Sequence, residues 1–547
     1  MTKVCDRQLK NGATVLYRVD ATKLESHTCL SQLKPFDCII FQFPHVGGKG
    51  NIKKNRNLLK DFFISASKVL SQDGMVLVTL CNGQGGTPMD NPQREWNNSW
   101  QIVAMATYGD FILTQTIPFD KVKWHLYQST GYRSQDKSFN FVGAVMHIFH
   151  RSPSHPESLG TDKKNKMYSR IHDLQKQSYA IVMKLFFEAL GEHLQHNMDM
   201  NGRDNLEGSA PYDEYLQLGT EYAEENNQNK ETTLNIQKLS LHPSEQKENP
   251  SGFVDYIRAM DGIQDHCCIR SFVQNVSVGR ITSVGVKLFH ETCPISSFIY
   301  PIMHYVTLTM PRRGSDFKDF QENVVRSLDE LCLTGNNLAT TESKEYSLNS
   351  LGSCDLETLC DDCQKINIED DCEEVSFYRK VVEGDSCTVP LSCTFFQRGN
   401  RMSVVFCLEN FVMNKFKIQD IRVLWSSDER WWQKFLRFLS GCDKNRDKCY
   451  IEPFSLYPPS YVHDLSFWES LEKEFDENAF IFLVREVTGD SVRELYLVEV
   501  YQLGERKSRW YRMIYQSCDQ ALTSHDAGRL QMIVRKSIKE RLDLTPR

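Results

Sequence analysis

The C-terminal part of the chain alternates strand-like and helix-like stretches in an order that few compact folds accommodate. A strand-like opening over 455–468 is followed by a helical stretch over 480–488, two strand-like stretches over 492–500 and 510–515, and a helical stretch over 526–542. These five elements follow the order β-α-β-β-α, and the interpretation is the β-α-β-β-α-β pattern that is typical of a split β-α-β sandwich. Residues 455–547 are therefore predicted to form one α+β domain.

Length and net charge limit how many domains the chain can have and how it could bind nucleic acid. A chain of 547 residues is long enough for three or four domains that each bury a core. The formal net charge of −7 excludes a global basic field, so any contact with nucleic acid must come from local patches. The composition alone does not indicate RNA.

Cysteine usage and hydropathy indicate an intracellular protein without a membrane span. The 18 cysteines lie in apolar strands as well as loops, and the first 25 residues contain no apolar core typical of a secretory leader. Reduced thiols in the cytoplasm, or in the nucleus or nucleolus, are expected. The longest apolar segments, such as 180–190, contain charged residues and are too short to cross a bilayer.

The first 152 residues predict an α/β domain. Short strands are expected over 14–19, 37–43 and 75–80, with a helix over 57–70 whose apolar residues recur at helical spacing and with Gly74 as its stop signal. Strand, helix, strand at this spacing is a βαβ unit, so we expect a parallel sheet covered on both faces. The unit continues to about Phe149.

The middle of the chain divides into a linker and a second mixed region. Residues 163–195 have helical periodicity, and 197–252 are polar with few large apolar groups, which predicts a disordered linker within 153–252. A mixed α+β block follows over 253–440, with an acidic insert near 335–374. Four cysteines of that insert include one Cys-x-x-Cys pair, Cys360 and Cys363, but no second pair, so free thiols are favoured over a zinc site. No metal site is predicted.

The C-terminal motifs resemble a known RNA-binding domain. Ser455-Leu-Tyr-Pro-Pro-Ser-Tyr-Val-His-Asp-Leu-Ser-Phe-Trp468, Gly489-Asp490 and Trp510-Tyr-Arg-Met-Ile-Tyr515 are similar to the ferredoxin-fold anticodon-binding (FDX-ACB) domain of phenylalanyl-tRNA synthetases. The resemblance implies an open sheet face on which aromatic rings stack bases and arginines meet phosphates. The candidate RNA contacts are Tyr457, Tyr461, Trp468, Arg512 and Tyr515. The alternative for Trp468 and Tyr515 is that both are core aromatics.

The block before this domain resembles the catalytic core of the same synthetases. Ile421-Arg-Val-Leu-Trp-Ser-Ser-Asp-Glu-Arg-Trp-Trp-Gln-Lys-Phe435 is similar to the segment that joins that core to the anticodon-binding tail. Glu409-Asn-Phe-Val-Met413 stands where the family has its third class II motif, which ends in Glu-Arg. In the family that arginine binds ATP phosphate, and Asn410 cannot replace a cation there. The middle block is interpreted as a degenerate synthetase core.

The N-terminal motifs resemble a second family. Val19-Asp-Ala-Thr-Lys-Leu24, Phe36-Asp-Cys-Ile-Ile-Phe-Gln-Phe-Pro-His-Val-Gly-Gly48 and Gly83-Gln-Gly-Gly-Thr-Pro88 are similar to the Rossmann-like domain of ribosomal RNA uridine-N3 methyltransferases. That family opens with a first strand and a Gly-rich loop, which Met1 to Gly12 do not supply. The domain is therefore expected to lack both.

The resemblance implies a ligand site beyond the carboxyl ends of the strands. Phe43, Pro44 and His45 are the candidate catalytic residues, facing the methionine end of S-adenosylmethionine or a target base. Asp20, with Ala21 and Thr22, is the candidate cofactor-binding segment; the alternative is that Asp20 caps a turn. A basic cluster beside the same loop is predicted to meet RNA phosphates, and a solvated charged face is the alternative. Its members are Lys49, Lys53, Lys54 and Arg56.

Two functions are consistent with these motifs. One is an S-adenosylmethionine-dependent rRNA (uridine-N3) methyltransferase whose C-terminal domain docks on structured RNA, and the other is a non-catalytic RNA-binding or assembly factor. A third alternative is a protein-interaction module that binds no RNA. The partner expected for the first two is rRNA or a tRNA-like structure, with no DNA and no membrane.

The presence of Asn410 where the family has arginine leads to a direct prediction for the middle block. Because an uncharged amide cannot neutralise a triphosphate, we expect the purified chain to lack aminoacyl-tRNA synthetase activity. The measurement is phenylalanine-dependent ATP–pyrophosphate exchange, with an active phenylalanyl-tRNA synthetase as the positive control. Exchange above the no-enzyme background would contradict the interpretation.

Overall fold

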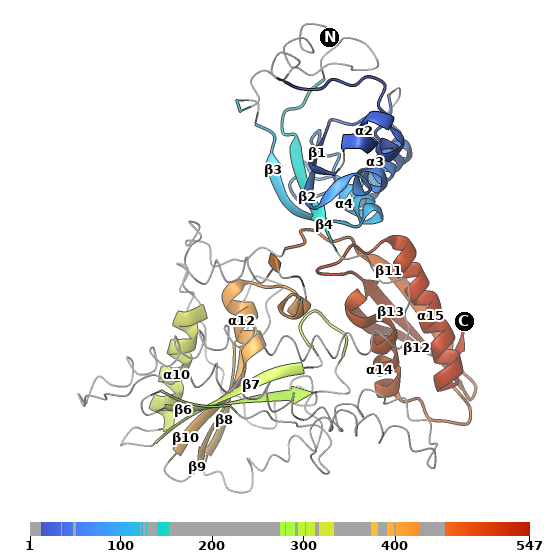
Figure 1. Ribbon diagram of the computed structural model, residues 1–547. Coiled ribbons are helices and arrows are strands. Elements are labelled where there is room, and N and C mark those ends of the chain that lie inside the picture. The colour runs from blue at the N-terminus through green and yellow to red at the C-terminus, as the bar shows by residue number, and fades with distance from the viewer. Residues whose placement is uncertain are drawn as a thin grey trace, which may run out of the picture. The chain divides into compact units, whose positions relative to one another are not determined.

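The computed structural model (Figure 1) describes the chain in seventeen stretches. These are residues 12–33, 35–47, 51–120, 122–123, 127, 139–152, 274–278, 281–289, 294–300, 302–311, 317–332, 374–380, 391–398, 401–426, 428, 430–431 and 454–547. The predicted helix over 163–195, the predicted linker and the cysteines of the acidic insert lie outside these residues. The chain forms two compact units, one of residues 1–158, 453–462 and 515–530, the other of 159–452, 463–514 and 531–547.

The first unit contains a four-stranded sheet in the order β1-β2-β4-β3. The strands are β1 (Phe36–Gln42), β2 (Leu70–Leu80), β3 (Phe111–Pro118) and β4 (Val145–Arg151). Between them lie α3 (Ile52–Ser67), η2 (Trp96–Asn98), α4 (Ile102–Ala106) and η3 (Thr107–Gly109), and before them η1 (Leu24–Ser26) and α2 (Thr28–Leu33). The predicted β-α-β unit is therefore confirmed.

The sheet is mixed rather than parallel throughout. β1 pairs parallel with β2, but β4 pairs antiparallel with both β2 and β3. The expectation of two covered faces is met only in part: Thr79, Met146 and Ile148, which point away from α3, are buried, but that second face is open at β1. Phe62 and Phe63 of α3 are buried with Val76 and Val78 in the core, whereas Ile40, which points to the other face, is 52% exposed.

Two local predictions in this unit were wrong for reasons of backbone conformation. Residues 14–19 form no strand, and Arg18 has φ +61°, a value incompatible with an extended strand. Gly74 does not end a helix, because β2 already begins at Leu70 and runs through it. The register of β1 against β2 shifts between Phe36 and Cys38, and Gly74 lies in that irregular stretch.

The middle block contains a six-stranded antiparallel sheet in the order β5-β6-β7-β10-β9-β8. The strands are β5 (Gln274–Val278), β6 (Ile281–Phe289), β7 (Ile302–Pro311), β8 (Glu374–Lys380), β9 (Leu391–Arg398) and β10 (Arg401–Cys407). The helices are α10 (Phe317–Cys332), α12 (Leu408–Phe416) and η6 (Ile421–Trp425). Phe320 of α10 meets Phe395 of β9 edge to face, with ring centroids 6.0 Å apart. The predicted mixed α+β block is thus present.

The C-terminal region has the predicted order of elements. These are β11 (Tyr461–Trp468), α14 (Glu477–Thr488), η7 (Gly489–Ser491), β12 (Val492–Leu503), β13 (Arg506–Tyr515), α15 (Ser524–Leu542) and β14 (Thr545–Pro546). The strands lie in the order β12-β13-β11-β14, so the first and third strands in the chain form the centre of the sheet. This antiparallel arrangement with two helices is that of a ferredoxin-like α+β sandwich.

Alternation along the strands divides the C-terminal side chains between two faces. Leu465 and Phe467 of β11 and Tyr511 and Met513 of β13 are buried. The apolar stripe of α14, which includes Phe480, is buried in the same core, and the rings of Phe480 and Tyr511 lie 4.7 Å apart. The intervening residues of both strands therefore point to the opposite, open face.

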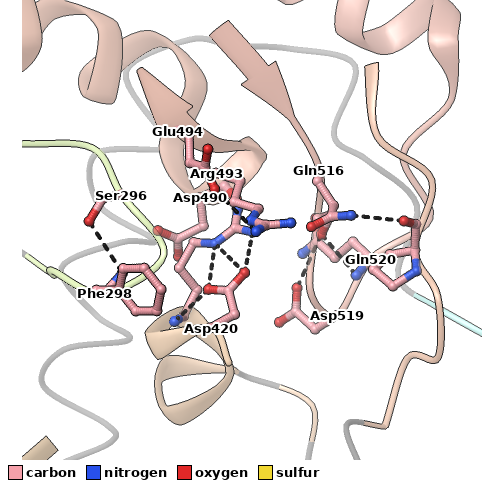
Figure 2. Close-up of polar contacts among 12 residues, drawn as sticks. Ser296, Phe298, Asp420, Asp490, Arg493, Glu494, Gln516, Asp519 and Gln520 are labelled. Atoms are coloured by element: carbon pink, nitrogen blue, oxygen red, sulfur yellow. Dashed lines mark hydrogen bonds and ion pairs between the residues drawn. The ribbon is translucent and has the colours of Figure 1, made fainter. Parts of the chain in front are cut away.

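Within the second unit, the middle block contacts the segment that joins α14 to β12. Tyr300 donates a hydrogen bond to both carboxylate oxygens of Asp490, at 3.2 Å each. Arg422, which is 4% exposed, donates to the backbone carbonyl of Asp490 at 2.6 Å and forms an ion pair with Asp420. Figure 2 shows Asp420, Asp490 and the neighbouring Arg493–Glu494 ion pair. The Gly489-Asp490 motif thus has an anchoring role in this structure.

Candidate functional site

The carboxyl ends of β1 and β2 lie side by side because the two strands are parallel. Phe43, directly after β1, donates its backbone N–H to Thr79 of β2 at 2.9 Å and has φ +49°. Its ring lies in a cluster of aromatic side chains, with centroid distances of 5.3 Å to Phe119, 5.5 Å to Tyr127 and 5.1 Å to Phe139. Burial raises the pKa of the Tyr127 hydroxyl. This aromatic cluster, defined by these four residues, marks the end of the sheet where an open α/β fold binds its ligands.

His45 is exposed beside this cluster and has a fixed ring orientation. Its Nδ1 accepts a hydrogen bond from the backbone N–H of Gly47 at 2.8 Å, and its ring centroid lies 5.9 Å from that of Trp100. In the neutral ring the proton is then on Nε2, so the exposed nitrogen is a hydrogen-bond donor. Pro44 is buried between Phe43 and His45. The three candidate catalytic residues therefore lie together. His45 is the one of the three with a polar side chain, and its Nε2–H is the group that can donate to a ligand.

Two buried side-chain oxygen atoms at the ends of β1 and β2 have no hydrogen-bond partner among the described residues. They are Gln42 Oε1, at the end of β1, and Thr79 Oγ1, directly across from it on β2. Thr79 is fully buried. Since leaving a buried polar atom unpaired costs about 1–3 kcal/mol, such atoms are typical of a position completed by a ligand or by water.

A rigid loop follows β2. Asp90, which is 3% exposed, accepts hydrogen bonds from the backbone N–H groups of Gly83 at 2.8 Å, Gly86 at 2.7 Å and Thr87 at 3.2 Å. Gly83 and Gly86 both have positive φ, which favours glycine. The short Gly-Gln-Gly-Gly motif is thus explained by a loop wrapped around one carboxylate. The sequence did not predict a role for Asp90.

His147 of β4 packs under the same loop. It is fully buried, with Nδ1 3.3 Å from the carbonyl oxygen of Val78 and Nε2 3.5 Å from Thr87 Oγ1. A Cβ atom at Gly85 would come within 2.8 Å of Nε2, so this position requires glycine. Burial lowers the pKa of His147 to about 4, and the nearby Asp90 only partly opposes this. The histidine is therefore neutral and structural at pH 7.

The predicted cofactor segment forms a turn. Asp20 is exposed and accepts hydrogen bonds from the backbone N–H of Thr22 at 2.9 Å and from its hydroxyl at 2.7 Å, which lowers the pKa of the carboxyl. Ala21 packs against the core of the domain. The turn-capping alternative thus describes the observed contacts of Asp20. Its predicted cofactor contact remains a prediction.

The predicted basic cluster is only partly a free surface. Lys53 and Lys54 are exposed in the first turn of α3, while Lys49 lies outside the described residues. The guanidinium of Arg56 donates to the backbone carbonyls of Ser99 at 2.7 Å and Asn97 at 2.8 Å, so it anchors the 96–99 segment. Lys53 and Lys54 are therefore the members that we retain as candidate phosphate contacts.

Two of the predicted RNA-binding residues lie on the open face of the C-terminal sheet. Trp468 is half-buried, and guanidinium groups lie over its ring, that of Arg506 at 4.7 Å and that of Arg547 at 5.0 Å. Arg512 makes a two-point contact with Asp464, at 2.8 and 3.1 Å, and lies 5.5 Å from the ring of Trp510. We call Trp468, Trp510, Arg506, Arg512 and Arg547 the arginine–tryptophan face.

The other three predicted RNA-binding residues have different surroundings. Tyr515 is fully buried, and burial raises its pKa, so the core alternative describes it and we leave it out of the proposed contacts. Tyr461 donates its hydroxyl to the carbonyl of Leu522 at 3.2 Å within the first unit. Tyr457 is 38% exposed. Sequence reasoning missed Trp510, Arg506 and Arg547, although alternate residues of β13 could have revealed the first two.

No described helix is long and apolar enough to cross a membrane. Within the same stretches of chain, no three His, Cys, Asp or Glu side chains come together in a group that could hold a metal ion.

The fold and these sites define a methyltransferase-like α/β domain joined to a ferredoxin-like domain of the anticodon-binding type. Residues 2–131 match the family model described as rRNA (uridine-N3-)-methyltransferase BTM5-like. Over 177 residues, 31% of this chain and 39% of the relative, the chain is 32% identical to the chloroplastic/mitochondrial phenylalanine–tRNA ligase of Arabidopsis thaliana. Both resemblances found in the sequence are thereby confirmed.

Two further relatives match nearly the whole chain. The Mus musculus ferredoxin-fold anticodon-binding domain-containing protein 1 homolog is 31% identical over 598 residues, covering 99% of this chain and 92% of the relative. The Homo sapiens ferredoxin-fold anticodon-binding domain-containing protein 1 is 31% identical over 610 residues, covering 98% and 91%. The chain belongs to the family of ferredoxin-fold anticodon-binding domain-containing protein 1.

The buried His147 leads to a prediction on pH. Its folded-state pKa of about 4 is below the ordinary value of 6.5, so the unfolded chain binds the extra proton between these two pH values. The stability of the first unit should therefore be complete above pH 6.5 and fall by about 3 kcal/mol as the pH drops to 4. Urea unfolding followed by hydrogen exchange in peptides of β2 and β4 measures it. His147→Gln should remove this slope, and the exposed-residue control His525→Gln should retain it; an unchanged slope in His147→Gln contradicts the assignment.

Proposed function

We propose that this protein binds structured RNA, with ribosomal RNA as its target, and methylates N3 of a uridine using S-adenosylmethionine. The observation that carries the proposal is the aromatic cluster at the carboxyl ends of the parallel strands β1 and β2, of which Phe43, Phe119 and Tyr127 lie inside the region that matches the rRNA (uridine-N3-)-methyltransferase model. A group of aromatic rings with polar atoms beside it suits a nucleobase. The non-catalytic RNA-binding factor is the second candidate.

The residues at this end of the sheet fit a ligand with both a ring and hydrogen-bonding groups. The unpaired Gln42 Oε1 accepts hydrogen bonds and Thr79 Oγ1 both donates and accepts, while Phe43 supplies an aromatic ring. When bound, S-adenosylmethionine supplies an electrophilic methyl group. Asp20 and Thr22 lie in the segment proposed to hold it.

His45 has a defined part in this proposal. A uridine can attack the methyl group through N3 once its N3 proton has passed to solvent water, and the resulting negative charge is shared by the two neighbouring carbonyl oxygens. Because Nδ1 of His45 accepts from Gly47, its Nε2–H can donate to one such oxygen and stabilise that charge. His45 is therefore proposed as a hydrogen-bond donor to the anion and not as the base.

The C-terminal domain is proposed to dock the RNA through the arginine–tryptophan face. It brings together two indole rings and three arginines, one of which is paired with the carboxylate of Asp464. Guanidinium planes and indole rings both stack on unpaired bases, and arginines pair with phosphates. The local positive charge is the kind of patch that a chain with net charge −7 needs in order to bind RNA.

The methyltransferase proposal predicts two separable activities of the full chain. We expect saturable binding of S-adenosylmethionine by isothermal titration and transfer of labelled methyl to N3 of uridine in rRNA. His45→Ala should lower the transfer rate by about 100-fold, the scale of one lost donor to an oxyanion, and leave cofactor affinity unchanged. The exposed His525→Ala is the matched control.

The outcome of that titration separates the two candidate functions. RNA binding without any affinity for S-adenosylmethionine would establish the non-catalytic factor and overturn the methyltransferase proposal. Cofactor binding and transfer that are indifferent to His45→Ala would remove His45 from the mechanism.

The RNA-binding proposal predicts loss of affinity on truncating either indole ring. Trp468→Ala and Trp510→Ala should each weaken RNA binding by about 1–3 kcal/mol, the contribution of one stacked base. Fluorescence anisotropy with labelled rRNA fragments and tRNA measures the dissociation constants. Trp96→Ala is the control, since Trp96 is 40% exposed but lies outside this face. Equal affinities for all four proteins would contradict the proposal.

A further inference from the structure

Strand β12 forms one edge of the C-terminal sheet (Figure 1) and is exposed along most of its length. Every residue from Tyr496 to Leu503 is exposed. Six of these eight are large and apolar or aromatic, with exposed fractions of 44% for Tyr496, 39% for Leu497, 38% for Val498, 45% for Val500, 48% for Tyr501 and 59% for Leu503. Because side chains alternate along a strand, both faces of the edge are apolar.

An edge of this kind is open to pairing with another extended chain. Edge strands of soluble proteins are usually protected by lysine, proline or a bulge that turns the edge away. Residues 496–503 contain no lysine and no proline, and Glu499 is their single charged residue. The backbone groups of an edge supply hydrogen bonds, and the flanking apolar side chains supply burial.

We propose that β12 is a self-association surface, at which the same edge of a second copy of this chain pairs antiparallel. Such an interface is closed and isologous, because the same residues are used by both copies. It would join two four-stranded sheets into one continuous sheet. This inference is independent of the proposed catalysis and RNA binding.

The register of the pairing follows from symmetry and from the contacts of β12. In a two-fold antiparallel pair one residue lies opposite itself. Leu495 already donates its backbone N–H to the carbonyl of Ile295 at 3.0 Å, so the free edge begins at Tyr496. A centre at Val498 would leave only 496–500 to pair, and a centre at Glu499 would oppose two carboxylates.

A centre at Val500 pairs residues 497–503 and so uses the free edge up to the end of β12 at Leu503. It places Leu497 opposite the partner's Leu503 and Val498 opposite the partner's Gln502. Glu499 then lies beside the partner's Tyr501 and not beside a second carboxylate. The sequence of β12 is therefore self-complementary about Val500.

An edge-to-edge interface is small, so the dimer should be reversible. Interfaces that bury less than about 1,200 Å² are typically weak or transient. We expect dissociation constants on the order of micromolar, which sedimentation velocity of the full chain resolves as a concentration-dependent shift from monomer to dimer.

Charged substitutions at Leu497 and Leu503, which face each other across the proposed interface, test the register. The variants L497E/L503E and L497K/L503K each place like charges opposite one another across the interface, so each alone should stay monomeric at concentrations where the unmodified chain dimerises. An equimolar mixture should restore the dimer, because every facing pair is then Glu with Lys. The matched control is L471K/M532K, since Leu471 is 70% and Met532 72% exposed away from β12. It should dimerise like the unmodified chain.

Three results would overturn the inference. The first is a monomer at all concentrations with β12 amides protected from hydrogen exchange, which would mean that another segment of the same chain covers the edge. The second is a dimer that both charge variants leave intact. The third is a mixture of the two charge variants that remains monomeric although each variant keeps the circular dichroism spectrum of the unmodified chain.

Discussion

The two-residue period of the β-strand is the constraint on which both sites of this protein depend. In β11 and β13 it sends Leu465, Phe467 and Tyr511 into the core and leaves Trp468 and Trp510 on the open face. In β1 and β2 the same period sends Val76 and Val78 toward α3 and turns Gln42 and Thr79 away from it. A shift of one residue in either sheet would exchange core and functional side chains.

The parallel pairing of β1 and β2 adds a second condition. Parallel neighbouring strands have their carboxyl ends at the same edge of a sheet. This brings the backbone N–H of Phe43 within 2.9 Å of the carbonyl oxygen of Thr79. The loop after β2 is then held by a buried carboxylate, Asp90, and by the neutral His147 beneath it. A neutral imidazole fits there because a charged one would be buried without a full set of partners. The rigidity of this loop comes from these groups and not from the glycines, which only make the close approach sterically allowed.

Sequence reasoning located what periodicity and local signals determine, and missed what depends on tertiary contacts. The β1-α3-β2 unit and the C-terminal order of elements were predicted because apolar spacing fixes them. The strand over 14–19 failed because a positive φ at Arg18 leaves no trace in residue type. Arg56 was predicted as a surface cation, but its guanidinium binds backbone carbonyls more than forty residues away in sequence. Tyr515 and Trp510 are both aromatic residues of β13, and only the strand's orientation in the sheet distinguishes core from surface.

The same reasoning explains why composition gave no indication of RNA. The chain carries 71 acidic and 64 basic groups, so their sum predicts repulsion from a polyanion. On the open face of β11 and β13, however, Arg506 and Arg547 lie over one indole ring while Asp464 is paired with Arg512. Screening limits surface electrostatics to about 8 Å at physiological ionic strength, so a distant carboxylate contributes little to a phosphate bound at this face. The local arrangement of three arginines around two indole rings therefore counts for more in RNA binding than the net charge of the whole chain.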